Sequence, residues 1–359
     1  MHGEASGEMM REPSRDRPRK SRWTLLLLLL LPFRCFAQTE NEYARGVAAF
    51  RAGDYAVAAS LFAVAETSAP GTTDALIYEA KSLVHLQNLS AAEGALRHYL
   101  ALHANSDEAL YLLGFVLHRE NNASESLEIY TRAAALKTPT GEDLKIVGLD
   151  YVLLNDYSDA IKWLEKAVEL DPKNKDAWYY LGRAYYSRSL LPESRKAFRA
   201  VLNLDPRDAR AENNLGLILE SEAKPDEALD AYRRAIEWQE AGSHQSEQPY
   251  LNLGNLLLEL DRAGEALAPL EKAVELGATN ASCHLKLGTA YLRMIRMPEA
   301  QRELEKAERL EPENAAIHYQ LARCYKQAHQ MEKARIEFQR TEELQNRAAG
   351  TGPRRPREP

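Results

Sequence analysis

The side chains of this chain that could bind a metal ion or carry a reaction are its histidines, cysteines and carboxylates, and their spacing decides whether they can act together. His98 and His103 are five residues apart, which puts them on different faces of one helix. Cys283 and His284 are adjacent, so a helix cannot point both at one site. The sequence also lacks the GxxxxGK(S/T), HExxH, GxSxG and paired CxxC patterns. These spacings predict a chain with no catalytic residues, no bound metal and no cofactor.

The remaining candidates are sites of covalent modification. Cys283 and Cys324 do not form a CxxC pattern, and we expect two buried free thiols rather than a disulfide. Asn88, Asn122 and Asn280 each begin an N-x-S pattern, the acceptor pattern for glycosylation. Turns also favour asparagine, because its side chain hydrogen-bonds the nearby backbone. The pattern therefore leaves open whether these asparagines are modified.

The composition is that of a globular protein, with 45% hydrophobic and 28% charged residues. Alanine and leucine are abundant while β-branched residues are sparse, which favours helices. The formal net charge of −7 disfavours nucleic acid and anionic membranes as the main partners.

The first 37 residues have the order of a secretory signal. A basic stretch with Arg15 and Arg22 at its ends is followed by an apolar run over residues 23–31, and a small residue, Ala37, comes after it. The apolar run is about half as long as a membrane span requires. We therefore expect residues 1–37 to be a signal peptide, cut after Ala37, and the mature chain to be periplasmic or secreted without a stable membrane span. A retained signal that acts as an anchor is the alternative.

The rest of the chain repeats with a period of 34 residues, which is clearest when Lys175 is counted as position 1 of a unit. Position 8 holds Gly46, Ala80, Gly114, Gly148, Gly182, Gly216, Gly254, Gly288 and Ala322. Position 20 holds Ala58, Ala92, Ser126, Ala160, Ser194, Ala228, Ala266, Ala300 and Ala334. Position 24 holds Phe62, Leu96, Tyr130, Leu164, Phe198, Tyr232, Leu270, Leu304 and Phe338. Two columns of small residues and one of large apolar residues predict one repeating structural unit.

These columns fit a pair of helices in each unit. Positions 4, 7, 8 and 11 share one face of a first helix, and positions 20, 24 and 27 share one face of a second. Small residues at positions 8 and 20 allow the two backbones to approach closely, and the large residue at position 24 fills the space beside the crossing. A proline at position 32, as in Pro70, Pro172, Pro206 and Pro312, ends the second helix. The pairs Gly53-Asp54 and Asn155-Asp156 mark the turn within a unit.

The pattern resembles the tetratricopeptide repeat (TPR) family, whose unit also has 34 residues. The resemblance covers residues 39–348 and implies an all-α, right-handed α-solenoid of about nine helix-turn-helix units. The array is interrupted by a four-residue insertion near residues 241–246, and residues 349–359 would form a disordered basic tail. Two residues depart from the family pattern, since Arg45 and Glu79 occupy position 7, where an apolar residue is expected.

The resemblance also implies where ligands bind, because the first helices of such units line a concave groove. The candidate groove residues, taken from the outward positions of these helices, are Tyr111, Phe115, Tyr179, Tyr180, Arg183, Asn213, Asn214, Asn252, Asn255 and Arg323. An asparagine at position 6, as in Asn214 and Asn252, can hydrogen-bond the backbone of an extended peptide in related arrays. Asparagine is also simply common at this position, so both interpretations stay open.

One binding mode of the family is disfavoured here. The chaperone-binding members combine a lysine at position 5 with an asparagine at position 9 of the same unit. In this chain Lys145 is followed by Leu149, and Asn255 is preceded by Leu251. The clamp for chaperone C-termini is therefore not expected.

The function expected from the sequence is a non-enzymatic scaffold, exported from the cytoplasm, that binds other proteins or extended peptides in its groove. The main alternative is an accessory adaptor in the assembly or export of envelope polysaccharide or outer-membrane proteins. A passive structural spacer is a third possibility. An enzyme built on the array is disfavoured by the absence of catalytic patterns.

Overall fold

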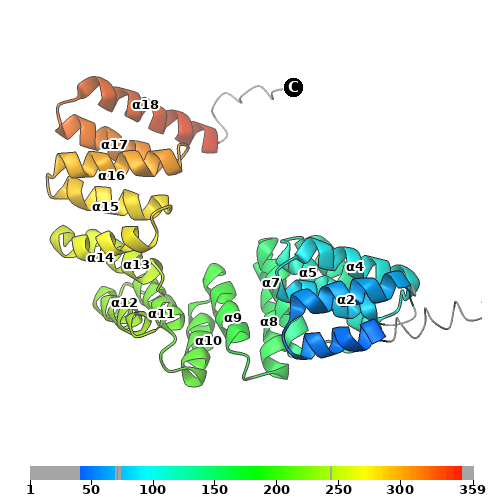
Figure 1. Cartoon of the computed structure of the whole chain (residues 1–359). Helices are drawn as coiled ribbons and strands as arrows, with labels where there is room; N and C mark the ends of the chain where they lie inside the picture. Colours follow the sequence, from blue (N-terminus) through cyan, green and yellow to red (C-terminus); the bar gives the residue numbers. More distant parts are fainter. Residues whose placement is uncertain (1–40, 69–70, 72–73, 243–244, 350–359) are drawn as a thin grey trace, which may run out of the picture. The chain divides into compact units, whose positions relative to one another are not determined.

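The computed structural model describes residues 41–68, 71, 74–242 and 245–349, and these residues contain helices and no strand (Figure 1). The described residues divide into two compact units, with the boundary between Thr138 and Pro139. The expected signal peptide, the first two residues of the expected array and all but the first residue of the expected tail lie outside the described residues.

In the first unit a helix over residues 41–51 is followed by five more. These are α2 (Tyr55–Ser68), α3 (Ala75–His85), α4 (Leu89–Leu102), α5 (Asp107–Arg119) and α6 (Ala123–Ala134). Each helix from α2 to α5 packs against the next one along the chain. Residues 41–134 therefore form three helix pairs, as the 34-residue period predicts.

The second unit continues the same alternation with helices α7 to α18. They are α7 (Gly141–Leu153), α8 (Tyr157–Leu170), α9 (Lys175–Ser187), α10 (Leu191–Leu204), α11 (Ala209–Ser221), α12 (Pro225–Glu240), α13 (Gln248–Glu259), α14 (Ala263–Leu276), α15 (Ala281–Arg293), α16 (Met297–Leu310), α17 (Ala315–Gln327) and α18 (Met331–Ala348). Consecutive helices pack on one another throughout this unit. The predicted all-α architecture of stacked helix pairs is confirmed.

The close crossing inside each pair follows from the small and large columns. A Cβ added at Gly182 would lie 2.9 Å from the ring of Phe198, and one added at Gly216 would lie 2.5 Å from the ring of Tyr232. Phe198 and Tyr232 are fully buried. Where position 20 is serine, its hydroxyl is also used, since Ser194 Oγ donates a 2.7 Å hydrogen bond to the carbonyl of Gly182. The predicted role of positions 8, 20 and 24 at the crossing is confirmed.

Prolines follow the ends of several helices, and asparagines lie at the starts of others. Helices α8, α10 and α16 end at Leu170, Leu204 and Leu310, two residues before the prolines at position 32. At the other end, Asn88 accepts a hydrogen bond from the Ala91 backbone and thereby caps α4. Asn280 caps α15 by accepting a hydrogen bond from the Ser282 backbone, and Asn122 precedes α6 without a capping hydrogen bond, so all three asparagines of the N-x-S patterns lie at helix starts.

Every turn within a pair uses one residue with a positive φ, always at position 15. It is Gly53 in the first pair, with φ of 81°, and Asn155 in the fourth, with φ of 59°. Glycine and asparagine adopt this left-handed conformation readily, which explains the predicted turns at these sites. Ile295 adopts it at 60° although it is β-branched, and 79% of its surface is exposed. This turn is held by the helices on either side rather than by its own residue.

The two departures from the repeat pattern are accommodated without a polar group in the core. Arg45 is exposed and forms a 2.9 Å ion pair with Glu42. Glu79 lines a cavity of about 450 Å³ together with Glu66 and His98. Burial, with the charge of Glu66 in addition, raises the pKa of the Glu79 carboxyl.

Cys283 and Cys324 are free and buried, as expected. Burial raises the pKa of the Cys283 thiol to about 11, so the thiol is protonated at neutral pH and poorly reactive. Among the described residues, the helices are all too short or too polar to cross a bilayer.

Candidate binding groove

Three first helices of the second unit, α9, α11 and α13, surround a pocket of about 600 Å³, which we call the α9–α13 pocket (Figure 1 shows these helices). Its described lining residues are Tyr179, Arg183, Ala209, Arg210, Asn213, Asn214, Leu217, Gln239, Gln245, Ser246, Gln248 and Pro249. This volume is within the range of ordinary ligand sites.

The lining side chains project from the flanks of the first helices, beside the crossings. Gly182 and Gly216, at position 8, contact the second helices of their pairs, and positions 5 and 9 lie beside position 8, one turn before it and one residue after it. Tyr179 and Arg183 are these positions on α9, and Asn213 is position 5 on α11. The spacing that packs each pair therefore also presents the pocket residues side by side.

Arg210 lines one wall of the pocket and is held there by an aromatic ring and two carboxylates. Its guanidinium lies 4.6 Å from the centre of the Tyr179 ring, a cation–π contact, and it forms ion pairs with Asp176 at 3.3 Å and with Asp208 at 3.2 Å. Although burial alone would lower the pKa of Arg210, the hydrogen bonds and charges of these aspartates raise it. Asp208 also accepts a 3.0 Å hydrogen bond from the Ala211 backbone and caps α11. Arg210 is thus fixed in place before any ligand arrives.

Side-chain amides connect α11 to α13. Gln248 Nε2 donates to Asn252 Oδ1 at 2.9 Å, and Asn252 Nδ2 donates to Asn213 Oδ1 at 2.9 Å. Asn213 is 5% exposed, and its own amide nitrogen donates to no described residue. Asn214 Nδ2 donates to the carbonyl of Arg210 at 2.7 Å. This chain of amides orients donors at the pocket without using all of them.

The four-residue insertion contributes the far wall. Gln239, near the end of α12, holds Ser246 at both backbone groups, since Gln239 Nε2 donates to its carbonyl at 3.0 Å and Gln239 Oε1 accepts from its N–H at 3.1 Å. This double contact places Gln245, Ser246 and Gln248 beside the pocket. The insertion therefore adds polar groups to the groove.

Among the described lining residues of the pocket, the charged side chains are all arginines. They include Arg183 and Arg210 and no carboxylate, although the whole chain has a formal net charge of −7. Arg210 is paired with two aspartates, whereas Arg183 is exposed and forms no ion pair with any described residue. The pocket thus offers one unpaired guanidinium beside several amides.

Five of the ten candidate groove residues come together in this region, and five do not. Tyr179, Arg183, Asn213 and Asn214 line the pocket, and Asn252 joins it through Asn213. As ligand contacts, all five stay predictions.

The other five lie elsewhere. Tyr180 packs against the core of the second unit, and Asn255 donates to Glu259 at 2.8 Å. Arg323 lies 6.0 Å from the Tyr319 ring, near the end of the array. Tyr111 and Phe115 belong to the first unit, where both pack against its core.

Five lining residues were not predicted from the sequence: Arg210, Gln239, Gln245, Ser246 and Gln248. One signal was available, because Arg210 is at position 2, where the preceding units carry acids such as Asp176. The remaining residues lie in the insertion or next to it, and its path depends on the contact between Gln239 and Ser246. No periodic pattern reaches them.

Comparisons with known proteins agree with the architecture. Family models described as TPR repeat or tetratricopeptide repeat match residues 148–189, 207–279 and 292–349. The TPR repeat-containing protein MJ1428 of Methanocaldococcus jannaschii is 24% identical over 175 residues, which are 45% of this chain and 30% of that protein. The type IV pilus assembly protein PilF of Pseudomonas aeruginosa is 28% identical over 156 residues, 42% of this chain and 61% of the relative. The chain thus covers less than two thirds of either relative.

Solved structures show the same fold. A tetratricopeptide repeat protein from Parabacteroides merdae superposes with a TM-score of 0.57 at 19% sequence identity, over 69% of this chain and 97% of that one. The repeat spacing, the paired helices and the family matches all lead to one conclusion: the chain is a tetratricopeptide repeat protein.

Proposed function

We propose that this chain is a non-enzymatic scaffold that holds an extended, carboxylate-bearing peptide of a partner protein in the α9–α13 pocket. The observation that carries the proposal is the charge of the pocket, where Arg183 is unpaired and the described lining has no carboxylate. A guanidinium binds a carboxylate through two parallel hydrogen bonds, which adds geometry to the attraction. The amides of Asn213 and Asn214 would serve the peptide backbone, since an amide offers both a donor and an acceptor.

The test is a selection of short peptides from a random display library on the purified full chain. The selected peptides are expected to be enriched in aspartate, glutamate or a free C-terminal carboxylate. Arg183→Glu is expected to weaken their binding about tenfold to a hundredfold, because a charge-assisted hydrogen bond is worth about 1.5 to 3 kcal/mol. Fluorescence anisotropy of labelled peptides would measure the change in Kd.

Arg199→Glu is the matched control, since Arg199 is an exposed arginine on α10 that does not line the pocket. It makes the same change in net charge and is expected to leave Kd within about twofold. Equal weakening by both variants would reduce the effect to net charge, and no weakening by Arg183→Glu would remove the pocket from the binding site. Circular dichroism would check that both variants keep their helices.

We also propose that the chain acts outside the cytoplasm. The second candidate function is that of an accessory adaptor in envelope assembly. The order of basic, apolar and small residues in residues 1–37 supports export. The named role of the 28% identical relative in type IV pilus assembly supports an envelope function. The expected result is a mature chain that begins at Gln38, measured by intact mass after expression of the whole chain in a bacterial host. A chain that keeps its first residues and fractionates with the cytoplasm would contradict export.

A further inference from the structure

Two buried histidines occupy position 4 in consecutive first helices, His284 in α15 and His318 in α17. His318 Nε2 lies 2.9 Å from the carbonyl oxygen of Pro312, and His284 makes the corresponding contact at 3.0 Å. In α9 the same position is Trp178, whose indole N–H donates to the carbonyl of Pro172 at 3.0 Å. A carbonyl only accepts, so His318 Nε2 carries a hydrogen and Nδ1 is the nitrogen available to other partners.

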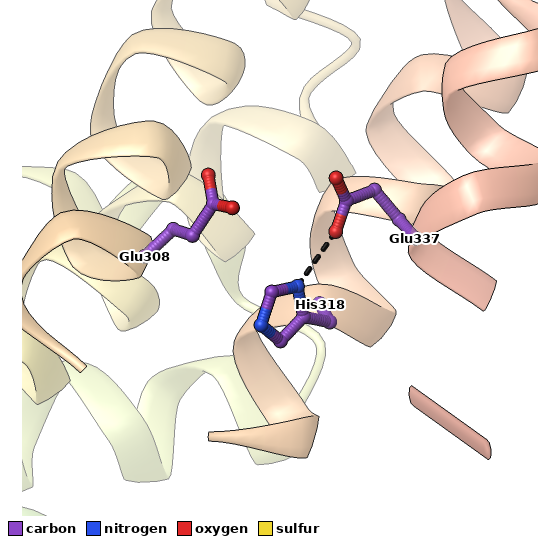
Figure 2. A group of neighbouring side chains, drawn as sticks. All are labelled: Glu308, His318 and Glu337. Atoms are coloured by element: carbon purple, nitrogen blue, oxygen red, sulfur yellow. Dashed lines mark hydrogen bonds and ion pairs between the residues drawn. The ribbon is translucent and has the colours of Figure 1, made fainter. Parts of the chain in front are cut away.

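The Nδ1 atom of His318 faces two carboxylates from the neighbouring helices. Glu337 of α18 has Oε2 2.6 Å from this nitrogen, and Glu308 of α16 points toward the same space from the other side (Figure 2). One ligand atom from each of the three residues lies within 4.8 Å of the others. Three helices thus converge on one nitrogen and two carboxylate oxygens.

The site at His284 is built on the same plan but is neutralised by cations. Glu303 contacts His284 at 2.8 Å and also lies 3.1 Å from Lys306 and 3.3 Å from Arg302. The residue that corresponds to Glu308 in this pair is Val274, so a second carboxylate is absent. At His284 the protein itself supplies the positive charge for its glutamate.

The site at His318 lacks such cations. Arg340 is the counterpart of Lys306, but it pairs with Glu313 and Glu343 instead of Glu337. Among the described residues, Glu308 forms no ion pair and Glu337 pairs only with His318. The last helix pair therefore has two neighbouring carboxylates whose ion-pair partner among the described residues is His318 alone.

We propose that Glu308, His318 and Glu337 bind a divalent transition-metal ion of the zinc class through Nδ1 and one oxygen of each carboxylate. Imidazole nitrogen and carboxylate oxygen are ordinary ligands of Zn²⁺, at about 2.0 to 2.2 Å. Ligands of one tetrahedral ion lie about 3.3 Å apart, so rotation of the two half-buried glutamates is enough to close the present spacing. The contact of Nε2 with Pro312 supplies the backbone partner that metal-binding histidines usually have.

Metal binding at this place would connect α16, α17 and α18 and so stabilise the end of the array. Because an ion bound only by the folded state stabilises it by mass action, the melting temperature would rise with the concentration of metal. The three protein ligands leave at least one coordination position for water.

The test uses the full chain, stripped with a chelator and titrated with ZnCl₂ in a calorimeter. One ion per chain is expected. Glu308→Gln is the decisive variant, because Glu308 forms no ion pair with a described residue whose loss could unfold the protein. It is expected to lower the affinity at least tenfold while leaving the metal-free melting temperature unchanged or higher.

Glu303→Gln is the matched control at the homologous His284 site, and it is expected to leave the affinity unchanged. Replacing zinc by Co²⁺ provides a second readout, since visible absorption reports the coordination of the ion, and that spectrum should be lost in Glu308→Gln. Equal zinc affinity in Glu308→Gln and in the wild-type chain would overturn the proposal. The absence of stoichiometric binding by the stripped wild-type chain to Zn²⁺ and Co²⁺ would overturn it as well.

Discussion

Replacing Phe198 by alanine is expected to lower the free energy of unfolding by about 3 to 5 kcal/mol, the usual cost of removing a buried aromatic ring. Phe198 is fully buried at the crossing of α9 and α10, in edge contact with Tyr179 at a centroid distance of 5.8 Å. The truncation leaves a cavity beside the α9–α13 pocket, so peptide binding should weaken together with stability. Urea unfolding followed by circular dichroism would measure the loss.

The partner residue across the crossing makes this expectation sharper. Gly182→Ala alone should destabilise the chain, since the added Cβ would lie 2.9 Å from the Phe198 ring. In the Phe198→Ala background the same change should be neutral or stabilising, because alanine favours the helix over glycine by about 1 kcal/mol and fills part of the cavity. A cost of Gly182→Ala that does not depend on residue 198 would show that the ring is not what the glycine accommodates.

Asp208→Ala is expected to cost about 2 to 3 kcal/mol, because it removes a helix cap and charge-assisted hydrogen bonds together. The side chain of Asp208 is only 4% exposed and contacts the Ala211 N–H at 3.0 Å, Lys175 at 3.2 Å and Arg210 at 3.2 Å. Its loss would also free Arg210 to move in the pocket. Urea unfolding of the full chain gives the stability, and anisotropy with the selected peptides gives the effect on binding.

The contribution of Asp208 to the free energy of unfolding should decrease as the pH is lowered. Although burial alone would raise the pKa of Asp208, its hydrogen bonds with Arg210 and the Ala211 backbone lower it below the ordinary value. The folded state therefore binds fewer protons than the unfolded state in this window, and the stabilisation is complete above about pH 4 and is lost as the pH falls through the lowered pKa. Asp208→Asn keeps the cap and should flatten this part of the acid-unfolding profile. An unchanged profile in that variant would contradict the assignment.

Much of the fold was predictable because the same local pattern occurs in every repeat. Small residues at positions 8 and 20 and large residues at position 24 recur throughout, so an atypical residue in one repeat does not change the prediction. The turn residues Gly53 and Asn155 fit their left-handed backbone, and the prolines at position 32 follow the helix ends. Ile295 shows the limit of such rules, since the array imposes a left-handed turn on a residue that disfavours it.

The groove was predictable only in part. Tyr179, Arg183 and Asn213 of the outward columns line one pocket, because a 34-residue step places equal positions of neighbouring repeats side by side. The columns could not show that Tyr180 packs against the core or that Asn213 receives the amide of Asn252. Side-chain hydrogen bonds between neighbouring repeats depend on the rotation of each helix about its axis. The hydrophobic period leaves this rotation variable by several degrees.

The sequence by itself determined the repeat period, the helix pairs, the close crossings and the family, because all of these depend on contacts between residues at fixed short separations. Only the tertiary structure decided which polar side chains of neighbouring helices come into contact. It placed the insertion against Gln239, left Arg183 without an ion pair to any described residue, and brought carboxylate oxygens of Glu308 and Glu337 to within 4.8 Å of a ring nitrogen of His318. The physical reason is that these groups lie on different helices, where small shifts in packing decide whether polar atoms come within bonding distance.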